Sequence, residues 1–131
     1  MNWEVIIHQL LNNLPHLLAI YAFGSRMNGH AGVESDLDLA VLSEGKSNPV
    51  LLWHLAGELS ELAGCPVDLV DLRAASTVMQ YQIITTGQRI WSQDYRASLY
   101  ESFILSAKTS LNEARAPILQ RILDEGVIHG R

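Results

Sequence analysis

Two aspartates separated by a single residue, Asp36 and Asp38, are the side chains of this chain best suited to chemistry. Apolar residues follow them, and the segment Asp36–Leu42 predicts a strand that enters the core. Side chains two residues apart on a strand project from the same face, so the two carboxylates would lie together. Because like charges repel at this range, either a cation or a hydrogen-bond network must lie between them, and Mg²⁺ suits such oxygen ligands.

A glycine and a serine precede these acids, with ten residues between Ser25 and Asp36. The apolar run Leu17–Phe23 predicts a buried strand that ends in a tight turn at Gly24. Glycine has no Cβ and lets the backbone approach a ligand, and the Ser25 hydroxyl can bond a phosphate oxygen if a helix begins there. Arg26 carries a permanent charge that suits phosphate, although a solvated loop arginine is an equally good interpretation.

A third carboxylate would complete a site for two metal ions, and the strand-like run Cys65–Leu72 supplies two candidates. Asp68 and Asp71 have opposite parity, so only one of them can face the site. We favour Asp68, because it lies inside the apolar stretch, where a carboxylate needs a compensating partner. Asp71 is nearer the strand end, where solvation or capping of the next turn is expected.

Together these motifs resemble the signature of the minimal nucleotidyltransferases of the DNA polymerase β superfamily. The resemblance rests on Gly24-Ser25, Asp36-Leu37-Asp38 and Val67-Asp68-Leu69-Val70, and it covers residues 17–72. The short length and the sequence around the motif are similar to the MntA-type antitoxins that accompany HEPN-domain toxins.

The resemblance implies a two-metal mechanism with ATP as the substrate and two Mg²⁺ ions as cofactors. Asp36 and Asp38 would hold the metals, Gly24 and Ser25 would contact the triphosphate, and Asp68 would bind the second metal and favour deprotonation of the attacking hydroxyl. The implied reaction moves AMP onto a hydroxyl, expected to be a tyrosine, of a HEPN ribonuclease toxin and thereby neutralises it.

Two other functions stay open at this stage. The chain could neutralise a toxin by binding and occlusion alone, with the nucleotidyltransferase fold as a scaffold. It could also transfer a nucleotide to a hydroxyl of a small molecule. The clustered acids favour catalysis, since a scaffold has no physical reason to keep mutually repelling carboxylates.

Composition agrees with a single-domain enzyme of the cytoplasm. The 131 residues have a formal net charge of −5 without a cluster of Lys and Arg, which disfavours free nucleic acid as a substrate. The first 25 residues lack Lys and Arg and are interrupted by polar residues, so they fit neither a signal peptide nor a membrane span. The single cysteine, Cys65, excludes an internal disulfide, which suits a reducing compartment.

The pattern of apolar residues predicts an α/β (α+β) fold, a small mixed sheet flanked by helices, with a catalytic core over residues 17–92. Helices are expected ahead of Pro15, from Asn48-Pro49 to Gly64 with a stripe of leucines, and over residues 75–86 before Gly87. A short strand is expected at Ile90-Trp91. The stripe comprises Leu51, Leu52, Leu55, Leu59 and Leu62.

The last third of the chain, residues 94–128, predicts helices in place of the extra domain with which larger superfamily members grip their acceptor. One long amphipathic helix would carry Tyr95, Leu99, Phe103, Ala107 and Leu111, and Pro117 would begin another. One hypothesis is that the region forms a surface for a protein partner or a second copy, although helices that simply cover the sheet and complete the core are the more common arrangement. The side chains concerned are Tyr100, Phe103, Ile118, Ile122 and Val127.

Overall fold

A mixed sheet is the centre of the computed structural model, which describes residues 2–24 and 36–107. Its four strands have the order β3-β2-β1-β4. β1 runs antiparallel to both β2 and β4, whereas β2 and β3 are parallel. The strands are β1 (Leu17–Phe23), β2 (Leu37–Ser43), β3 (Val67–Asp71) and β4 (Gln88–Ser92).

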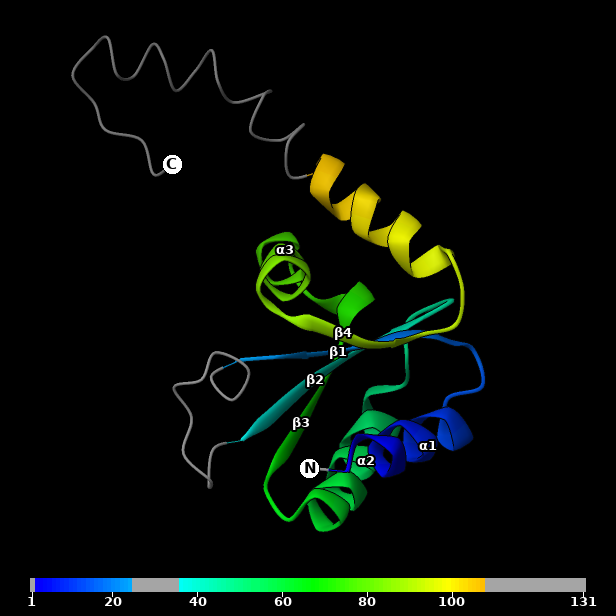
Figure 1. The fold of residues 1–131 in the computed structure, drawn as a ribbon, viewed down its shortest axis with the longest axis vertical. Helices are drawn as coiled ribbons and strands as arrows, with labels where there is room; N and C mark the ends of the chain where they lie inside the picture. Colours follow the sequence, from blue (N-terminus) through cyan, green and yellow to red (C-terminus); the bar gives the residue numbers. More distant parts are fainter. Residues whose placement is uncertain (1, 25–35, 108–131) are drawn as a thin grey trace, which may run out of the picture.

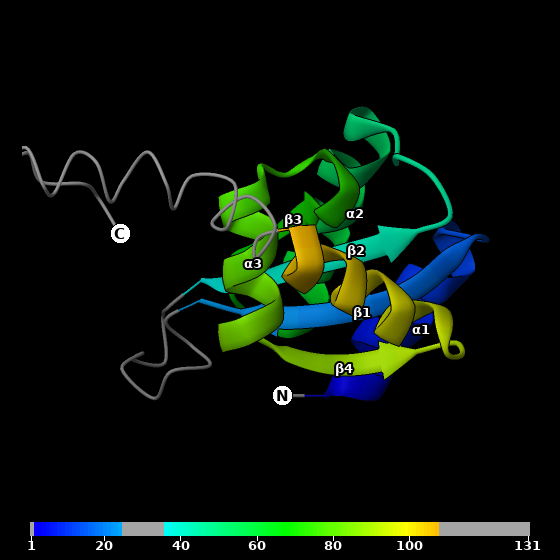
Figure 2. The same cartoon turned by 90° about the horizontal axis from the view of Figure 1, so that it is seen from above.

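Helices cover both faces of this sheet, as Figure 1 shows with the sheet seen edge-on. On one side lie α1 (Trp3–Asn13) and α2 (Pro49–Ala63); on the other lie α3 (Thr77–Thr86) and a helix over residues 96–107. Figure 2, seen from above, places the 96–107 helix across the strands. The mixed sheet flanked by helices confirms the expected fold class.

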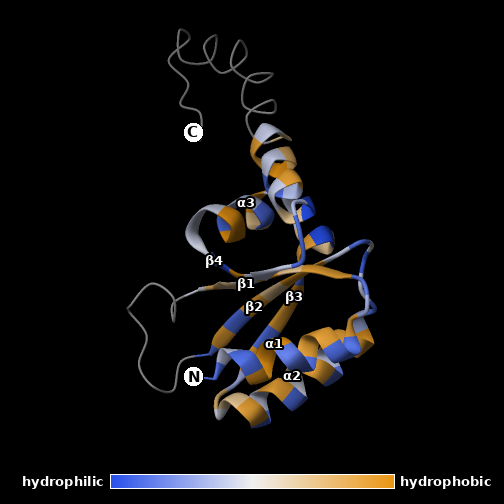
Figure 3. Ribbon diagram, turned by 45° about the vertical axis from the view of Figure 1, so that its right-hand side comes forward, coloured by the Kyte–Doolittle hydropathy of each residue, from blue (hydrophilic) through white to orange (hydrophobic). Residues whose placement is uncertain are grey.

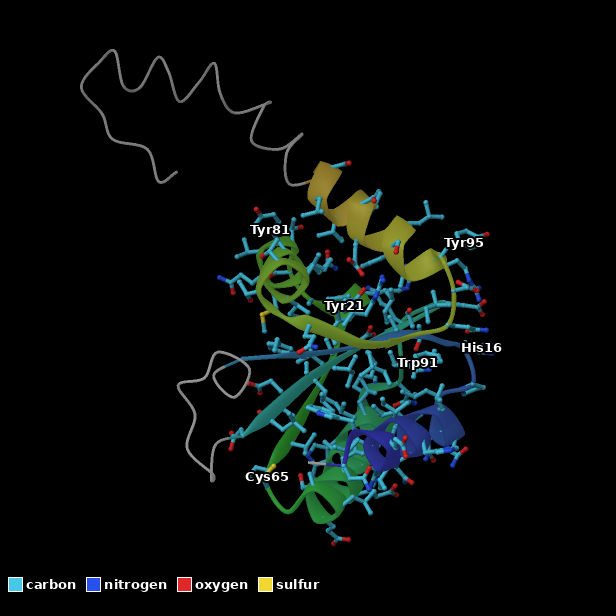
Figure 4. The ribbon with its side chains drawn as sticks, viewed as in Figure 1. His16, Tyr21, Cys65, Tyr81, Trp91 and Tyr95 are labelled. Carbon is cyan, nitrogen blue, oxygen red and sulfur yellow. The ribbon has the colours of Figure 1, made fainter. Side chains whose placement is uncertain are left out.

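The two central strands are buried on both faces, which explains why their sequences are almost wholly apolar. Alternate residues therefore enter two separate clusters. In β1, Ile20 packs with α1 and α2, whereas Tyr21 packs on the side of α3. Figure 4 shows Tyr21 and Trp91 on opposite sides of the sheet, and Figure 3 shows apolar residues along the strands between the more polar helices.

Most helix boundaries follow the signals read from the sequence. The Asn48 side chain accepts hydrogen bonds from the first backbone N–H groups of α2, Pro49 begins the helix, and Gly64 ends it in the left-handed conformation. Of the predicted leucine stripe, Leu52, Leu55 and Leu59 are buried. Leu51 and Leu62 are exposed, so the buried face is narrower than predicted.

The region after β3 begins with a short 3₁₀ turn, η2 (Leu72–Ala74), and only then enters α3. Ser76 caps α3 by accepting a hydrogen bond from the backbone N–H of Met79, so the helix starts two residues later than expected. It ends before Gly87, as predicted, and β4 contains the expected strand at Ile90-Trp91.

The helix over 96–107 confirms the helix predicted there, and most of the apolar stripe read from the sequence is exposed. Phe103 is 66% exposed, and Tyr95 and Leu99 are also exposed. Ala97 and Ile104 are buried instead. The tyrosine hydroxyl of Tyr21 in β1 donates a 2.7 Å hydrogen bond to Glu101, which also pairs with Arg89 of β4, so polar contacts hold this helix to the sheet.

The expectations for Leu111, Ile118, Ile122 and Val127 and for the helix after Pro117 lie outside the described residues. Among the helices that are described, none has the length and apolar character needed to cross a membrane.

Candidate active site

Gly24 directly follows β1 and has a backbone conformation that favours glycine, with φ of +87°. A Cβ built on Gly24 would stand 2.2 Å from Oδ2 of Asp38, too close for any real side chain. The turn predicted at this glycine is therefore present, and the absent side chain leaves room for a carboxylate on the neighbouring strand. Conformation and close approach both require glycine here.

Asp38 and Asp68 lie opposite one another on the parallel strands β2 and β3. Paired residues of neighbouring strands project from the same face, so the two carboxylates meet across the ladder. Partial burial, followed by the charges of Asp68 and Asp36 and a hydrogen bond with Asp68, raises the pKa of Asp38 above its ordinary value. The two strands thus hold together carboxylates that repel each other when ionised.

Asp36 lies immediately before β2 and is exposed. Its charge contributes to the raised pKa of Asp38, which places the two acids within electrostatic reach. In the described part of the chain, no three His, Cys, Asp or Glu side chains stand close enough together to form a metal-binding group. The structure therefore assembles the pair Asp38 and Asp68, with Asp36 beside it.

Asp71 has a structural role. Asp68 was favoured because it lies inside an apolar stretch, and that reason is wrong. Asp71 is the buried acid, 8% exposed, whereas Asp68 is exposed. The Asp71 carboxylate accepts hydrogen bonds from the backbone N–H groups of Ser47 and Arg73, at 2.8 and 3.1 Å, and so caps η2. The parity argument holds, since Asp68 alone of the two faces Asp38. The expected phosphate contacts of Ser25 and Arg26 fall outside the described residues.

Two residues of α2 that the sequence argument did not single out line hollows at the β3 edge, on the sheet face that α2 covers, whereas the Asp38 and Asp68 side chains project from the opposite face, as Ala40 and Val70 do. Trp53 is 75% exposed, and it lines two adjoining surface hollows that both include Asp68. Gly57 lies one helical turn further on and lines the larger hollow, of about 490 Å³. A signal was present in the sequence: a tryptophan next to the leucine stripe of an amphipathic helix is out of place on a solvated face.

Comparisons with known proteins agree with this geometry. Residues 6–96 match the family model described as polymerase beta, nucleotidyltransferase. Over 123 residues the chain is 35% identical to the protein adenylyltransferase MntA of Shewanella oneidensis. The match covers 94% of this chain and 88% of that protein.

Solved structures give the same result. A crystal structure of a toxin–antitoxin with AMP-PNP contains a chain with 35% identity and a TM-score of 0.80, over 94% of this chain and 99% of that one. The complex of a tri-AMPylated Shewanella oneidensis HEPN toxin with its MNT antitoxin gives 33% identity and a TM-score of 0.72, over 92% of this chain and 94% of that one.

Proposed function

Because this chain belongs to the polymerase β nucleotidyltransferase family, we propose that it transfers AMP from ATP to a hydroxyl of a HEPN-domain toxin and so neutralises that toxin. The observation that carries the proposal is the meeting of Asp38 and Asp68 beside the glycine turn at Gly24. This arrangement unites a backbone that can approach phosphate with two facing carboxylates. The relatives that act on or bind a HEPN toxin support the choice of acceptor.

Each residue of the site would have a role that follows from its position. The backbone at Gly24, with Ser25 and Arg26 after it, would hold the β- and γ-phosphates of ATP. The acceptor oxygen attacks the α-phosphorus, the bond to the pyrophosphate oxygen breaks, and the hydroxyl proton leaves. Asp68, which is exposed and next to Asp38, is the side chain we assign to that proton. The products are the AMP ester of the acceptor and pyrophosphate.

Mg²⁺ fits this pair of acids. Both donors are hard carboxylate oxygens, and Mg²⁺ is usually bound through one or two carboxylates together with substrate phosphates, so a three-residue protein cage is not required. Burial and, after it, the charges of Asp68 and Asp36 raise the pKa of Asp38, and a cation bound between these acids would offset their repulsion. Asp36, Asp38 and Asp68 are the proposed ligands, and two bound ions would stabilise charge on the entering and leaving oxygens.

The cytoplasm is the proposed location, because ATP and reduced thiols are both found there and the buried Cys65 is a free thiol. The exposed apolar residues Leu99 and Phe103 of the helix over 96–107 supply a surface for the toxin. Apolar side chains gathered on a solvated face are typical of protein contacts.

Intact-mass analysis of a co-expressed HEPN toxin tests the proposal. With ATP and Mg²⁺, the toxin should gain whole AMP units beside the natural chain and none beside an Asp36→Ala/Asp38→Ala variant, whose fold is checked by circular dichroism. If the toxin stays unmodified and both versions hold it in a stable inactive complex, the chain acts by occlusion. An unmodified toxin that remains active would direct the search for an acceptor to small molecules.

A further inference from the structure

A hollow of about 410 Å³ lies beside the first turns of the helix over 96–107. Leu18 and Tyr100, which line it, pack in the cluster on the α3 side of the sheet, the side from which Asp38 and Asp68 also project. The hollow and the acid pair therefore lie on the same face of the sheet. The lining residues are Leu18, Glu44, Arg73, Arg96, Leu99 and Tyr100.

The hollow is separated from the acids along the direction of β2. Arg73 donates a hydrogen bond through Nε to the carbonyl oxygen of Ser43, the last residue of β2, whereas Asp38 is the second residue of that strand. Five residues of strand span about 17 Å. A change in the hollow should therefore alter how a large partner binds without altering the chemistry at Asp38.

Arg73 brings to this hollow a positive charge that the described residues do not neutralise. Its guanidinium lies over the ring of Tyr100, 4.9 Å from the ring centroid, and is half-buried. In the described part of the chain no carboxylate lies within ion-pair distance of Arg73, because Glu44, the acid of the hollow, pairs with Arg96 at 2.7 Å. The ring and the bond to Ser43 hold the guanidinium in one orientation, so its terminal nitrogens can bind a carboxylate in the two-pronged geometry that arginine favours.

Apolar side chains continue this surface along the helix. Leu99 lines the hollow and is 60% exposed, and Phe103 lies one helical turn further on and is 66% exposed. The centroids of the Phe103 and Tyr100 rings are 6.5 Å apart, so the exposed ring adjoins the ring that orients Arg73. An apolar stripe that ends at an oriented positive charge fits an amphipathic segment that carries Asp or Glu.

We infer that Arg73, Leu99, Tyr100 and Phe103 form a docking surface for a segment of the HEPN toxin in which Asp or Glu stands next to apolar side chains. This inference rests on the function proposed above. The carboxylate of the segment pairs with the terminal nitrogens of Arg73, and its apolar side chains cover Leu99 and Phe103.

The position of the docking surface favours the toxin as its occupant. A protein that presents a hydroxyl to Asp38 and Asp68 lies over the face of the sheet to which the docking surface also belongs. A relative of this chain is found in complex with a HEPN toxin. Two other occupants, residues 108–131 of the chain itself and a second copy, are distinguished from the toxin by the measurements below.

Equilibrium binding to the purified cognate HEPN toxin, without ATP, tests the inference. Arg73→Gln should raise the Kd roughly tenfold, since a hydrogen bond between charged groups is typically worth about this much. Arg73→Lys should recover part of the loss, because it restores the charge. Lys46→Gln removes an exposed positive charge from the loop after β2, outside the hollow, and as the matched control should keep the Kd within about twofold of the natural value.

Leu99→Ala tests the apolar part of the docking surface and leaves the contacts of Arg73 with Ser43 and Tyr100 in place. It should raise the Kd for toxin roughly fivefold, because a leucine buried between the partners contributes about this much. Leu62→Ala is its control, since Leu62 is similarly exposed but belongs to α2 on the opposite side of the sheet.

Two further measurements separate docking from a structural role of Arg73. In steady-state AMP transfer, Arg73→Gln should raise the KM for toxin, while kcat at saturating toxin and the KM for ATP stay within about twofold of the natural values. The Kd of the natural chain should rise with NaCl concentration, and this rise should be smaller in Arg73→Gln, because one charge pair is lost. A loss of packing alone would not change the salt dependence.

The same Kd in Arg73→Gln and Lys46→Gln, or the same salt dependence in Arg73→Gln and the natural chain, would overturn the inference. So would dimerisation of the isolated chain that Leu99→Ala abolishes, because a second copy would then cover the surface. A lower unfolding free energy of the isolated chain in both Arg73→Gln and Leu99→Ala, with an unchanged Kd, would assign the surface to residues 108–131 instead. Docking as expected without AMP transfer would refute the proposed function alone, so the two failures are distinguishable.

Discussion

Replacing Gly24 with alanine tests the closest contact of the site. The new Cβ would stand 2.2 Å from Oδ2 of Asp38, so the carboxylate must retreat by roughly 1 Å to reach an ordinary contact distance. A side chain at φ of +87° also strains the backbone by about 1–2 kcal/mol. Misplacement of a catalytic group by about 1 Å can lower a rate by roughly a hundredfold.

Gly64→Ala is the matched control for this change. Gly64 has φ of +72°, and apart from its chain neighbours and the adjoining helix backbone nothing lies within 4 Å of its Cβ position, so the substitution imposes similar backbone strain without touching an acid. We expect both variants to lose about 1–2 kcal/mol of unfolding free energy in urea titrations. Only Gly24→Ala should lose AMP transfer, by about two orders of magnitude in kcat. Transfer by Gly24→Ala within threefold of Gly64→Ala would refute the reasoning.

Four further substitutions separate catalysis from stability. Asp38→Asn should abolish transfer yet raise the melting temperature at pH 7 without Mg²⁺. Burial and nearby acids raise the pKa of Asp38 in the folded state, so the protonated form that stabilises the fold is lost as the pH rises. The difference in melting temperature from the natural chain should therefore vanish under acid conditions. Asp68→Ala should abolish transfer with little change in melting temperature. Asp71→Ala should instead lower the unfolding free energy by about 1–3 kcal/mol, because two backbone N–H groups lose their acceptor. AMP-transfer assays and urea titrations of both variants distinguish the catalytic role of Asp68 from the structural role of Asp71. Tyr21→Phe removes the buried hydroxyl that donates to Glu101 and should cost about 1–2 kcal/mol in the same titration with transfer retained.

Local sequence signals predicted most of the helices and strands. The cap at Asn48 and the stop at Gly64 are chemical requirements of helix ends, and they placed α2 correctly. Strand parity showed that only one of Asp68 and Asp71 can face the acids of β2, but the register of β2 and β3 was needed to identify that residue as Asp68. Strand pairing was not readable, since the alternation within one strand does not tell which neighbour it meets.

The errors arose where burial depends on tertiary contacts. Asp71 caps the turn after β3, as expected, but it is also buried, and the backbone N–H groups of Ser47 and Arg73 donate to its carboxylate. In the helix over 96–107, spacing selected the stripe of Tyr95 and Phe103, but the helix turns Ala97 and Ile104 to the sheet instead. Two faces of a helix can both be apolar, and only packing decides which one is buried.

The residues that conflict with folding rules mark the site more clearly than the residues that satisfy them. Gly24 has a left-handed backbone at a point where any side chain would collide with the Asp38 carboxylate, and Asp38 faces Asp68, which it repels when both are ionised. Burial and the neighbouring acids raise the pKa of Asp38, so the ionised pair lowers the stability of the isolated chain. A conflict of this kind is expected where a reactant completes the structure, and Mg²⁺ bound together with ATP would offset the repulsion. The chain should therefore melt at a higher temperature when ATP and Mg²⁺ are added together.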